Sequence, residues 1–237
     1  MSPYLLINIA IIIFPLLFSF EKRVGFVYKW PEVFTAMAVI SPVYVLWDIA
    51  ATARGDWAFN PNFTLGVKIF GLPVEEILFF VTVPYSCLFI YESLRYYLGE
   101  HRVVFNAAIY RGMAVFCMML SGVFYRKPYT CTVLLFVGIF LLVACQCYSY
   151  LLKSRLYWLF IAVTFLPFLI FNYLLTFPPI VSYGSEAIWG LRVLTIPVED
   201  FLYSYSMLSW YLLIYLQARQ KKLIPPGGVG YGSGSMS

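Results

Sequence analysis

The sequence predicts an all-α fold, a polytopic membrane helix bundle of about seven transmembrane helices, built as two parallel three-helix repeats joined by a linker helix. Three observations predict this fold. Of the 237 residues, 62% are hydrophobic and only 11% are charged, whereas soluble domains are about 45 to 50% apolar. Apolar segments long enough to cross about 30 Å of hydrocarbon recur along the chain. An acidic motif near residue 75 recurs near residue 199.

Apolar segments of roughly 20 residues are typical of membrane-spanning helices. Seven segments qualify or nearly qualify: 4–20, 32–51, 72–91, 103–125, 129–152, 156–177 and 196–216. The first segment lacks the basic leader and the small-residue cleavage site of a secretory signal, so we interpret it as a span. The Gly- and Ser-rich residues 223–237 predict a flexible tail.

The internal repeat has a constant offset of 124 residues. The stretch "GVKIFGLPVEEILFF" (66–80) aligns at this offset with "GLRVLTIPVEDFLYS" (190–204). The aligned polar pairs are Lys68 with Arg192, Glu75 with Glu199, Glu76 with Asp200, and Asp48 with Asn172. The offset also places the first three segments on the last three. We therefore expect a first repeat over 1–98, a linker helix within 99–128 and a second repeat over 129–222.

The linker segment fixes the relative direction of the repeats. Three spans followed directly by three more would leave the repeats antiparallel, whereas one additional crossing restores the original direction. Both acidic motifs then begin their helices at the same face of the bilayer. Asp48 lies near the end of a segment that runs towards that face. A polar pocket shared by the two repeats is therefore expected.

The basic residues predict the orientation in the membrane. Ten of the 16 Lys and Arg residues fall on the face that carries the C-terminus: Lys22, Arg23, Lys29, Arg95, Arg102, Lys153, Arg155, Arg219, Lys221 and Lys222. Cytoplasmic loops carry the excess of positive charge, so we expect a cytoplasmic C-terminus in a multi-pass protein of the cytoplasmic membrane. Because these residues occupy short loops rather than one continuous face, we expect no nucleic-acid partner.

The acidic motifs are the main candidates for chemistry. Pro73 and Pro197 predict helix starts, so the acids that follow lie in a first helical turn, where the helix dipole favours negative charge. They could serve only as caps, but ionisable groups within spans are costly and usually functional. Burial raises a carboxyl pKa, so such a group can hold a proton and then donate it. Adjacent helical residues project about 100° apart, so one acid of each pair should act and the other should brace it.

Several other residues are candidates for pocket support. Asp48 and Asn172 occupy equivalent positions in the two repeats. Either side chain could equally make only a hydrogen bond that packs helices together. Lys68 and Arg192 stand seven residues before Glu75 and Glu199, and could pair with the acids or anchor in the headgroups. Aromatic residues make up 20% of the chain. Rings near the acids could stabilise a cation in apolar surroundings, although aromatic belts at the membrane interfaces explain many of them.

The "PVEE" and "PVED" motifs, the aromatic pair Phe79 and Phe80, "WD" at 47–48, and Trp57 and Asn60 in "W-x-F-N-P" resemble the membrane-integral lycopene cyclase domain family. The resemblance covers nearly the whole chain and is to the fused form of the bacterial heterodimeric carotenoid cyclases. It implies that Glu75, Glu76, Glu199 and Asp200 are catalytic. It also implies that lycopene is the substrate and that its linear ends become β-ionone rings, through protonation of the terminal double bond, attack by the next alkene and loss of a proton.

Other functions remain as alternatives. An ε-ring former and a cyclase of longer carotenoids would share the motifs, and a proton-coupled transporter would also place acids inside parallel repeats. A retinal-binding photoreceptor needs a lysine that segment 196–216 lacks, and an intramembrane prenyltransferase needs clustered aspartates that the chain lacks. The chain has no G-x-G-x-x-G motif after a strand. We therefore expect neither flavin nor metal as a cofactor.

Overall fold

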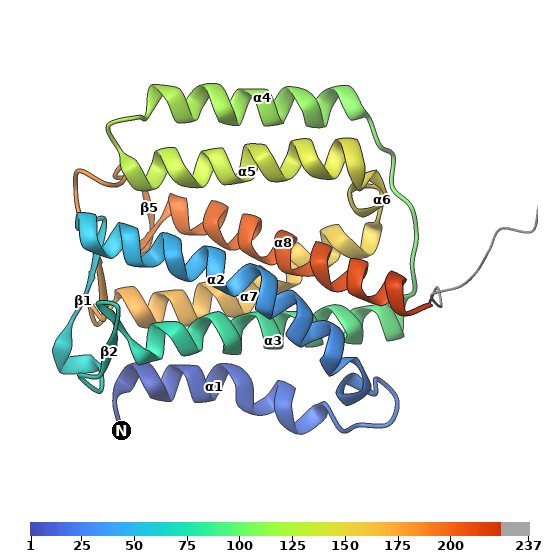
Figure 1. The fold of residues 1–237 in the computed structure, drawn as a ribbon, viewed down its shortest axis with the longest axis horizontal. Helices are drawn as coiled ribbons and strands as arrows, with labels where there is room; N and C mark the ends of the chain where they lie inside the picture. Colours follow the sequence, from blue (N-terminus) through green and yellow to red (C-terminus); the bar gives the residue numbers. More distant parts are fainter. Residues whose placement is uncertain (224–237) are drawn as a thin grey trace, which may run out of the picture.

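The computed structural model describes residues 1–223, with a long helix at each of the seven predicted segments (Figure 1). The long helices are α1 (Pro3–Phe18), α2 (Trp30–Arg54), α3 (Val74–Leu98), α4 (Ala107–Val123), α5 (Pro128–Cys147), α7 (Arg155–Thr176) and α8 (Val198–Leu223). Short helices are η1 (Phe26–Lys29), η2 (Pro61–Phe63) and α6 (Ser149–Leu152). The tail predicted over 223–237 lies, beyond Leu223, outside the described residues.

The two repeats run in the same direction. Helices α1, α2 and α3 correspond to α5, α7 and α8, and each pair begins 124 or 125 residues apart. In Figure 1, α1, α3, α5 and α8 begin at one end of the bundle, while α2, α4 and α7 begin at the other. Helix α4 returns the chain between the repeats and packs along α5. The prediction of parallel repeats is therefore confirmed.

Six short strands join the loops at the end of the bundle where α3 and α8 begin. They are β1 (Trp57–Phe59), β2 (Lys68–Ile69), β3 (Leu72–Pro73), β4 (Val181–Tyr183), β5 (Arg192–Val193) and β6 (Ile196–Pro197). The all-α prediction missed them because strands of two or three residues give no periodic signal. Hairpins β2–β3 and β5–β6 each lead directly into the acidic motif of their repeat.

The pair β1–β4 joins the two repeats. These strands are equivalent at the offset of 124, and they pair antiparallel with Ala58 opposite Ser182. A strand that pairs with its own copy in this way lies on a local two-fold axis. The two loops approach closely here, since a Cβ on Gly184 would lie 2.6 Å from the carbonyl oxygen of Gly55. The two halves of the polar end are thus held together by main-chain hydrogen bonds.

Two of the prolines inside the helices, Pro15 and Pro84, are matched by hydroxyl groups on neighbouring helices. Proline has no N–H, so it leaves the carbonyl four residues earlier without its helical partner. Pro15 frees the carbonyl of Ile11, and Ser86 Oγ of α3 donates to it at 3.0 Å. Pro84 frees the carbonyl of Phe80 in the same way, and its two donors are Ser41 Oγ at 3.0 Å and Tyr211 Oη at 3.3 Å. Such donors replace bonds that hydrocarbon cannot supply.

A buried ion-pair cluster closes the opposite end of the bundle. Glu92 of α3 is 2% exposed and lies 2.6 Å from Lys29 Nζ and 3.6 Å from Arg95. Arg219 and Tyr215 of α8 also donate to Glu92 Oε1, the latter at 2.8 Å. One carboxylate therefore ties together the start of α2, the end of α3 and the end of α8.

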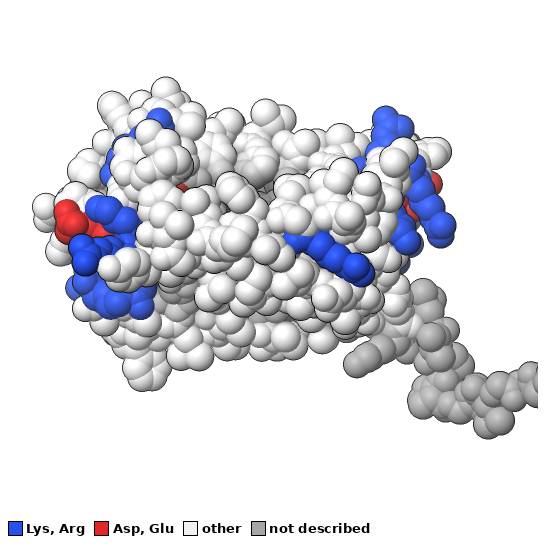
Figure 2. Space-filling view, turned by 90° about the horizontal axis from the view of Figure 1, so that it is seen from above, with Lys and Arg blue, Asp and Glu red and all other residues white. Residues whose placement is uncertain are grey.

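The surface agrees with a bundle that crosses a membrane. Helices α3, α5 and α7, and α2 together with η1, are long and apolar enough to span it, whereas α1 and α4 are shorter apolar helices. Figure 2 shows Lys and Arg gathered at both ends of the molecule, with mostly uncharged residues between them. The chain is therefore a membrane protein, and we propose that all seven long helices cross the bilayer.

Candidate active site

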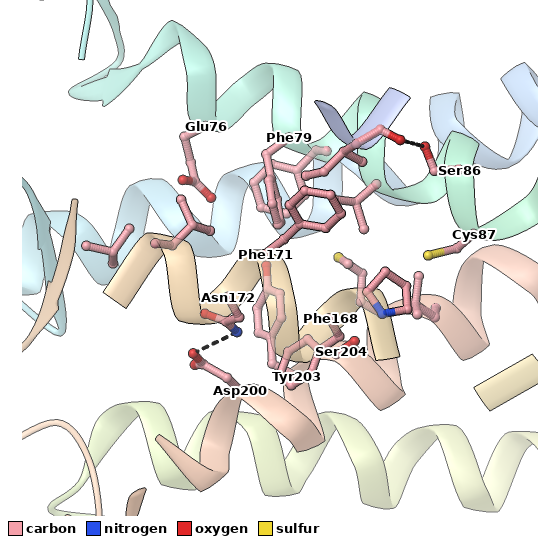
Figure 3. A pocket seen from close by; sticks show the side chains of 18 of the residues that line it. Glu76, Phe79, Ser86, Cys87, Phe168, Phe171, Asn172, Asp200, Tyr203 and Ser204 are labelled. Carbon is pink, nitrogen blue, oxygen red and sulfur yellow. Dashed lines mark hydrogen bonds between the residues drawn. The ribbon is translucent and has the colours of Figure 1, made fainter. Parts of the chain in front are cut away.

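A cavity of about 320 Å³ lies inside the bundle and is lined mainly by α1, α3, α7 and α8 (Figure 3). The carboxyl and amide side chains of the lining come from both repeats: Asp48, Glu76, Asn172 and Asp200. They lie at the end where α3 and α8 begin. The remainder of the lining is mostly apolar and aromatic. The cavity thus combines a polar end with a long apolar body.

The two hairpins position Glu76 and Asp200. Each is the third residue of its helix, and the helix is fixed at its first residue by a bond back to the loop. Val74 N donates to the carbonyl of Val67 at 3.0 Å, and Val198 N makes the equivalent bond at 3.1 Å. Pro73 lies just before α3 rather than in its first turn. The start of each helix is therefore set rigidly, with the third residue facing the cavity.

Glu75 and Glu199 do not line the cavity. Each is buried, and each accepts a hydrogen bond from a hydroxyl and from a backbone amide. The four donors all lie at 2.6 Å: Ser2 and Leu65 on Glu75, and Thr130 and Trp189 on Glu199. These contacts hold the loops that precede the hairpins against the starts of α1 and α5. The two glutamates therefore brace the polar end.

Asp200 accepts hydrogen bonds from three side chains. The donors are Tyr129 Oη at 2.6 Å, Tyr183 Oη at 2.7 Å and Asn172 Nδ2 at 3.2 Å. Burial, together with the charge of Asp200, raises the pKa of the Tyr183 phenol well above its ordinary value. Tyr183 therefore stays protonated and remains a donor. The contact between Asn172 and Asp200 is drawn in Figure 3.

Glu76 faces a second acid instead of an amide. Its carboxyl accepts a hydrogen bond from Tyr4 and interacts with Asp48. Asp48 Oδ1 accepts from Trp57 Nε1 at 2.6 Å and from Thr52 at 3.3 Å. Asp48 Oδ2 is buried, and no donor among the described residues reaches it. Two carboxyl groups can share a hydrogen bond only when one of them carries a proton.

Aromatic rings line the apolar part of the cavity next to these acids. Phe79 of α3 and Tyr203 of α8 occupy equivalent positions in the two repeats, and Phe168 and Phe171 of α7 line the same space (Figure 3). Phe80 also lines the cavity and is 1% exposed. The faces of such rings attract cations in apolar surroundings. The predicted proximity of rings and acids is therefore present in the structure.

Three predicted support residues do not reach the cavity. Asn60 caps η2 by accepting a hydrogen bond from Asn62 N at 3.0 Å. Lys68 is exposed on β2, and Arg192 donates to the carbonyl of Thr195 at 2.7 Å within its own hairpin. The hairpins turn outward between the basic residue and the acid. A separation of seven residues therefore does not bring the two side chains together.

The three tyrosines that donate to the acids were absent from the sequence prediction: Tyr4, Tyr129 and Tyr183. Tyr4 and Tyr129 both occur in the first turn of the opening helix of their repeat. Tyr183 stands opposite Trp57 in the β1–β4 pair. The recurrence of a tyrosine at the start of α1 and α5 is the signal that could have identified two of them.

The comparisons with known proteins agree with this arrangement. The family model described as lycopene cyclase matches residues 2–94 and again residues 126–218. The two matches are separated by the same 124 residues as the repeats. No curated protein and no solved structure matches the chain. Since the two matches together cover most of the chain, the protein belongs to the lycopene cyclase family and carries the family's domain twice.

Proposed function

We propose that this carotenoid cyclase converts the linear ends of lycopene into β-ionone rings by acid-initiated cyclisation. The observation that carries the proposal is the convergence of three carboxyl groups from two repeats on one ring-lined cavity. Asp48 and Glu76 form the proton donor in this proposal. Asp200 is the group that stabilises the cation and takes a proton back.

The assignment of the donor rests on hydrogen-bond satisfaction. Glu76 and Asp48 face each other, and Asp48 Oδ2 has no other partner in the described part of the chain. A proton shared between the two carboxyls satisfies this buried oxygen and avoids two adjacent negative charges in an apolar space. The shared proton is then available to the terminal double bond of a polyene.

The assignment of the base rests on the three donors to Asp200. Hydrogen bonds from Tyr129, Tyr183 and Asn172 stabilise a carboxylate more than a neutral acid. An ionised Asp200 lies in the same cavity as the shared proton, but it belongs to the other repeat. One repeat thus supplies the acid, and the other supplies the negative charge.

The reaction conserves atoms and electrons. The proton adds to the inner CH carbon of the terminal double bond and leaves a tertiary cation on the outer, dimethyl-substituted carbon. The next alkene attacks this cation, which forms the ring bond and moves the positive charge to a ring carbon. Loss of a proton from the ring carbon that bears the polyene gives the β-ionone ring, and Asp200 accepts that proton. The product is an isomer of the substrate.

The aromatic rings stabilise the cationic intermediates. Phe79, Phe168, Phe171 and Tyr203 surround the path between the donor and Asp200, where cation–π attraction contributes about 0.5 to 2 kcal/mol for each favourable ring. The apolar lining also keeps water from capturing the cation. The position of the base decides which proton is lost, so an ε ring would require the base beside a different ring carbon.

Expression in lycopene-accumulating bacteria tests the proposal directly. Pigments are extracted and separated by chromatography, and the membrane fraction is checked for the protein. We expect lycopene to be replaced by products with one or two β-ionone rings. Unchanged lycopene with the protein present in the membrane would contradict cyclase activity on this substrate. Products with ε rings would retain the cyclase and overturn the assignment of ring type.

A further inference from the structure

The cavity is an elongated space that carries its acids at one end. Its lining on α3 runs from Glu76 to Ile90, which corresponds to about 21 Å along the helix axis. Trp57 of β1 and Tyr183 of β4 line the polar end, where they donate to Asp48 and Asp200. A linear hydrocarbon can therefore approach the acids only with its end first and its length along α3.

The cavity reaches the outer surface between α1 and α7. Ala10 and Phe14 of α1 line it, yet both are exposed on the outside of the bundle, Phe14 by 66%. On the opposite side, Pro167 and Phe168 of α7 line the same opening. All four side chains are apolar, and they lie on the belt that faces hydrocarbon in a membrane. The opening therefore connects the cavity to the bilayer rather than to water.

The two-fold symmetry of the repeats places an equivalent gap between α2 and α5. A separate apolar pocket occupies this gap. At the offset of 124, its lining residues Val43, Tyr44 and Ile139 correspond to Pro167, Phe168 and Pro15, all of which line the main cavity. The fold thus has two related gaps, and the difference between them indicates which one can admit substrate.

Packed aromatic rings close the second gap. Trp47 lies 4.6 Å from Phe136 and 4.9 Å from Tyr203, measured between ring centroids, and Tyr44 lies 5.7 Å from Phe136. The counterpart of Phe136 in the first repeat is Ile12, which is only partly buried. In the gap between α1 and α7, an aliphatic side chain thus takes the place of the ring that helps to close the gap between α2 and α5. The pocket between α2 and α5 therefore ends before the acids.

Resting on the cyclase function proposed above, we infer that the gap between α1 and α7 is the entrance for the polyene from the bilayer. The gap between α2 and α5 does not admit substrate. One entrance and one acidic end accommodate one end of a linear carotenoid at a time. A substrate with two linear ends must therefore leave, turn round and enter again for its second ring, so the product with one ring is released as an intermediate.

Narrowing the entrance tests this inference. Ala10→Trp adds a large side chain at the opening, and Ile139→Trp makes a similar change at the closed gap, where Ile139 is 39% exposed. Purified variants are compared in liposomes that contain graded amounts of lycopene, and thermal unfolding is measured alongside. We expect Ala10→Trp to lower the initial rate at low lycopene content by about ten-fold, as impaired substrate entry requires. The rate of Ile139→Trp should stay within about two-fold of the wild-type rate.

The outcomes separate the entrance from the activity itself. An inactive wild-type protein would remove the cyclase function. An active wild type with equal rates in both variants, or an equal loss in both, would overturn the entrance between α1 and α7. If Ala10→Trp does not fold, Ala10→Phe makes the same comparison with a smaller ring.

Release of the intermediate has its own measurement. Liposomes receive isotopically labelled lycopene, and a large excess of unlabelled lycopene is added once the product with one ring has appeared. We expect the labelled one-ring product to persist, because the excess substrate competes for the single entrance. Continued conversion of the labelled one-ring product to the two-ring product at the earlier rate would overturn the inference that each end requires a separate entry.

Discussion

Asn172 donates a hydrogen bond of 3.2 Å from its side-chain amide to Asp200. At the equivalent place in the first repeat, the two partners are Asp48 and Glu76. An amide can donate to a carboxylate without a proton transfer, whereas two acids need a shared proton. This one difference between otherwise similar halves leads to distinct roles for the two repeats.

Glu76→Gln should remove the acid while keeping the size of the side chain. Because general acid catalysis typically contributes 10² to 10⁴-fold, we expect at least about a 100-fold loss of ring formation. Asp48→Asn should give a smaller loss, since Glu76 can still carry a proton next to an amide. The measurement is the initial rate in liposomes, with thermal unfolding as the control for folding. A Glu76→Gln protein with wild-type rate would show that the proton comes from elsewhere.

Asp200→Asn should impair the later steps, in which positive charge is held and a proton is removed. We expect a loss of about 10² in rate, of the size seen when a single charge-stabilising group is removed. Tyr183→Phe removes one of the three donors to Asp200 and should have a smaller effect. Chromatography of the products is the second readout, because a displaced base changes which proton is lost. Unchanged rate and unchanged products in Asp200→Asn would contradict its role.

Glu75→Ala and Glu199→Ala should mainly reduce stability. Each change leaves a partly buried backbone amide, that of Leu65 or of Trp189, without its acceptor, together with a buried hydroxyl, that of Ser2 or of Thr130. Such a loss costs about 1 to 3 kcal/mol. We expect lower unfolding temperatures in detergent and only a modest loss of rate in the protein that remains folded. If either variant keeps wild-type stability but loses the reaction, the bracing role is wrong and that glutamate acts in the chemistry.

Glu92→Gln should destabilise the end of the bundle remote from the acids. It leaves Lys29 and Arg219 without their shared carboxylate, and breaking a buried ion pair typically costs about 3 to 5 kcal/mol. Glu21→Gln is a control, since its ion pair with Arg23 is largely exposed. The free energy of unfolding is compared for the two variants. Equal stability of Glu92→Gln and wild type would show that the cluster contributes little.

Ser86→Ala should expose the coupling between α3 and the bend in α1. It leaves the carbonyl of Ile11, freed by Pro15, without a donor, at a cost of about 1 to 3 kcal/mol. Pro15→Ala restores the N–H within α1, so the same serine change should cost less in that background. A double-mutant cycle on unfolding measures this coupling. Additive effects of the two changes would contradict it.

Much of the fold was predictable because hydrophobic segments and the offset of 124 residues can be counted. The parallel direction of the repeats followed from one additional span. The sequence could not tell which acid of each motif faces the cavity, because a rotation of about 100° separates neighbours and the phase of the helix is set by the hairpin before it. That phase depends on bonds such as Val74 N to the carbonyl of Val67. Such contacts leave no pattern in the sequence.

The polar partners of the acids were also only partly predictable. Asp48 and Asn172 were found because they share the offset, and both line the cavity. Lys68 and Arg192 were selected for closeness along the chain, which a two-residue strand and a sharp turn undo. Asn60 was selected from the W-x-F-N-P motif, but its side chain caps η2 instead. The tyrosines come from the starts of other helices, so only the packing of the two repeats brings them to the acids.

The β1–β4 ladder connects the halves through peptide groups, whose bonding does not depend on the identity of the side chains. Divergence of the two strands therefore need not loosen the joint: Ala58 and Ser182 already face each other where strict symmetry would place identical residues. Two repeats joined in this way can take on different parts of one reaction while their relative position is preserved.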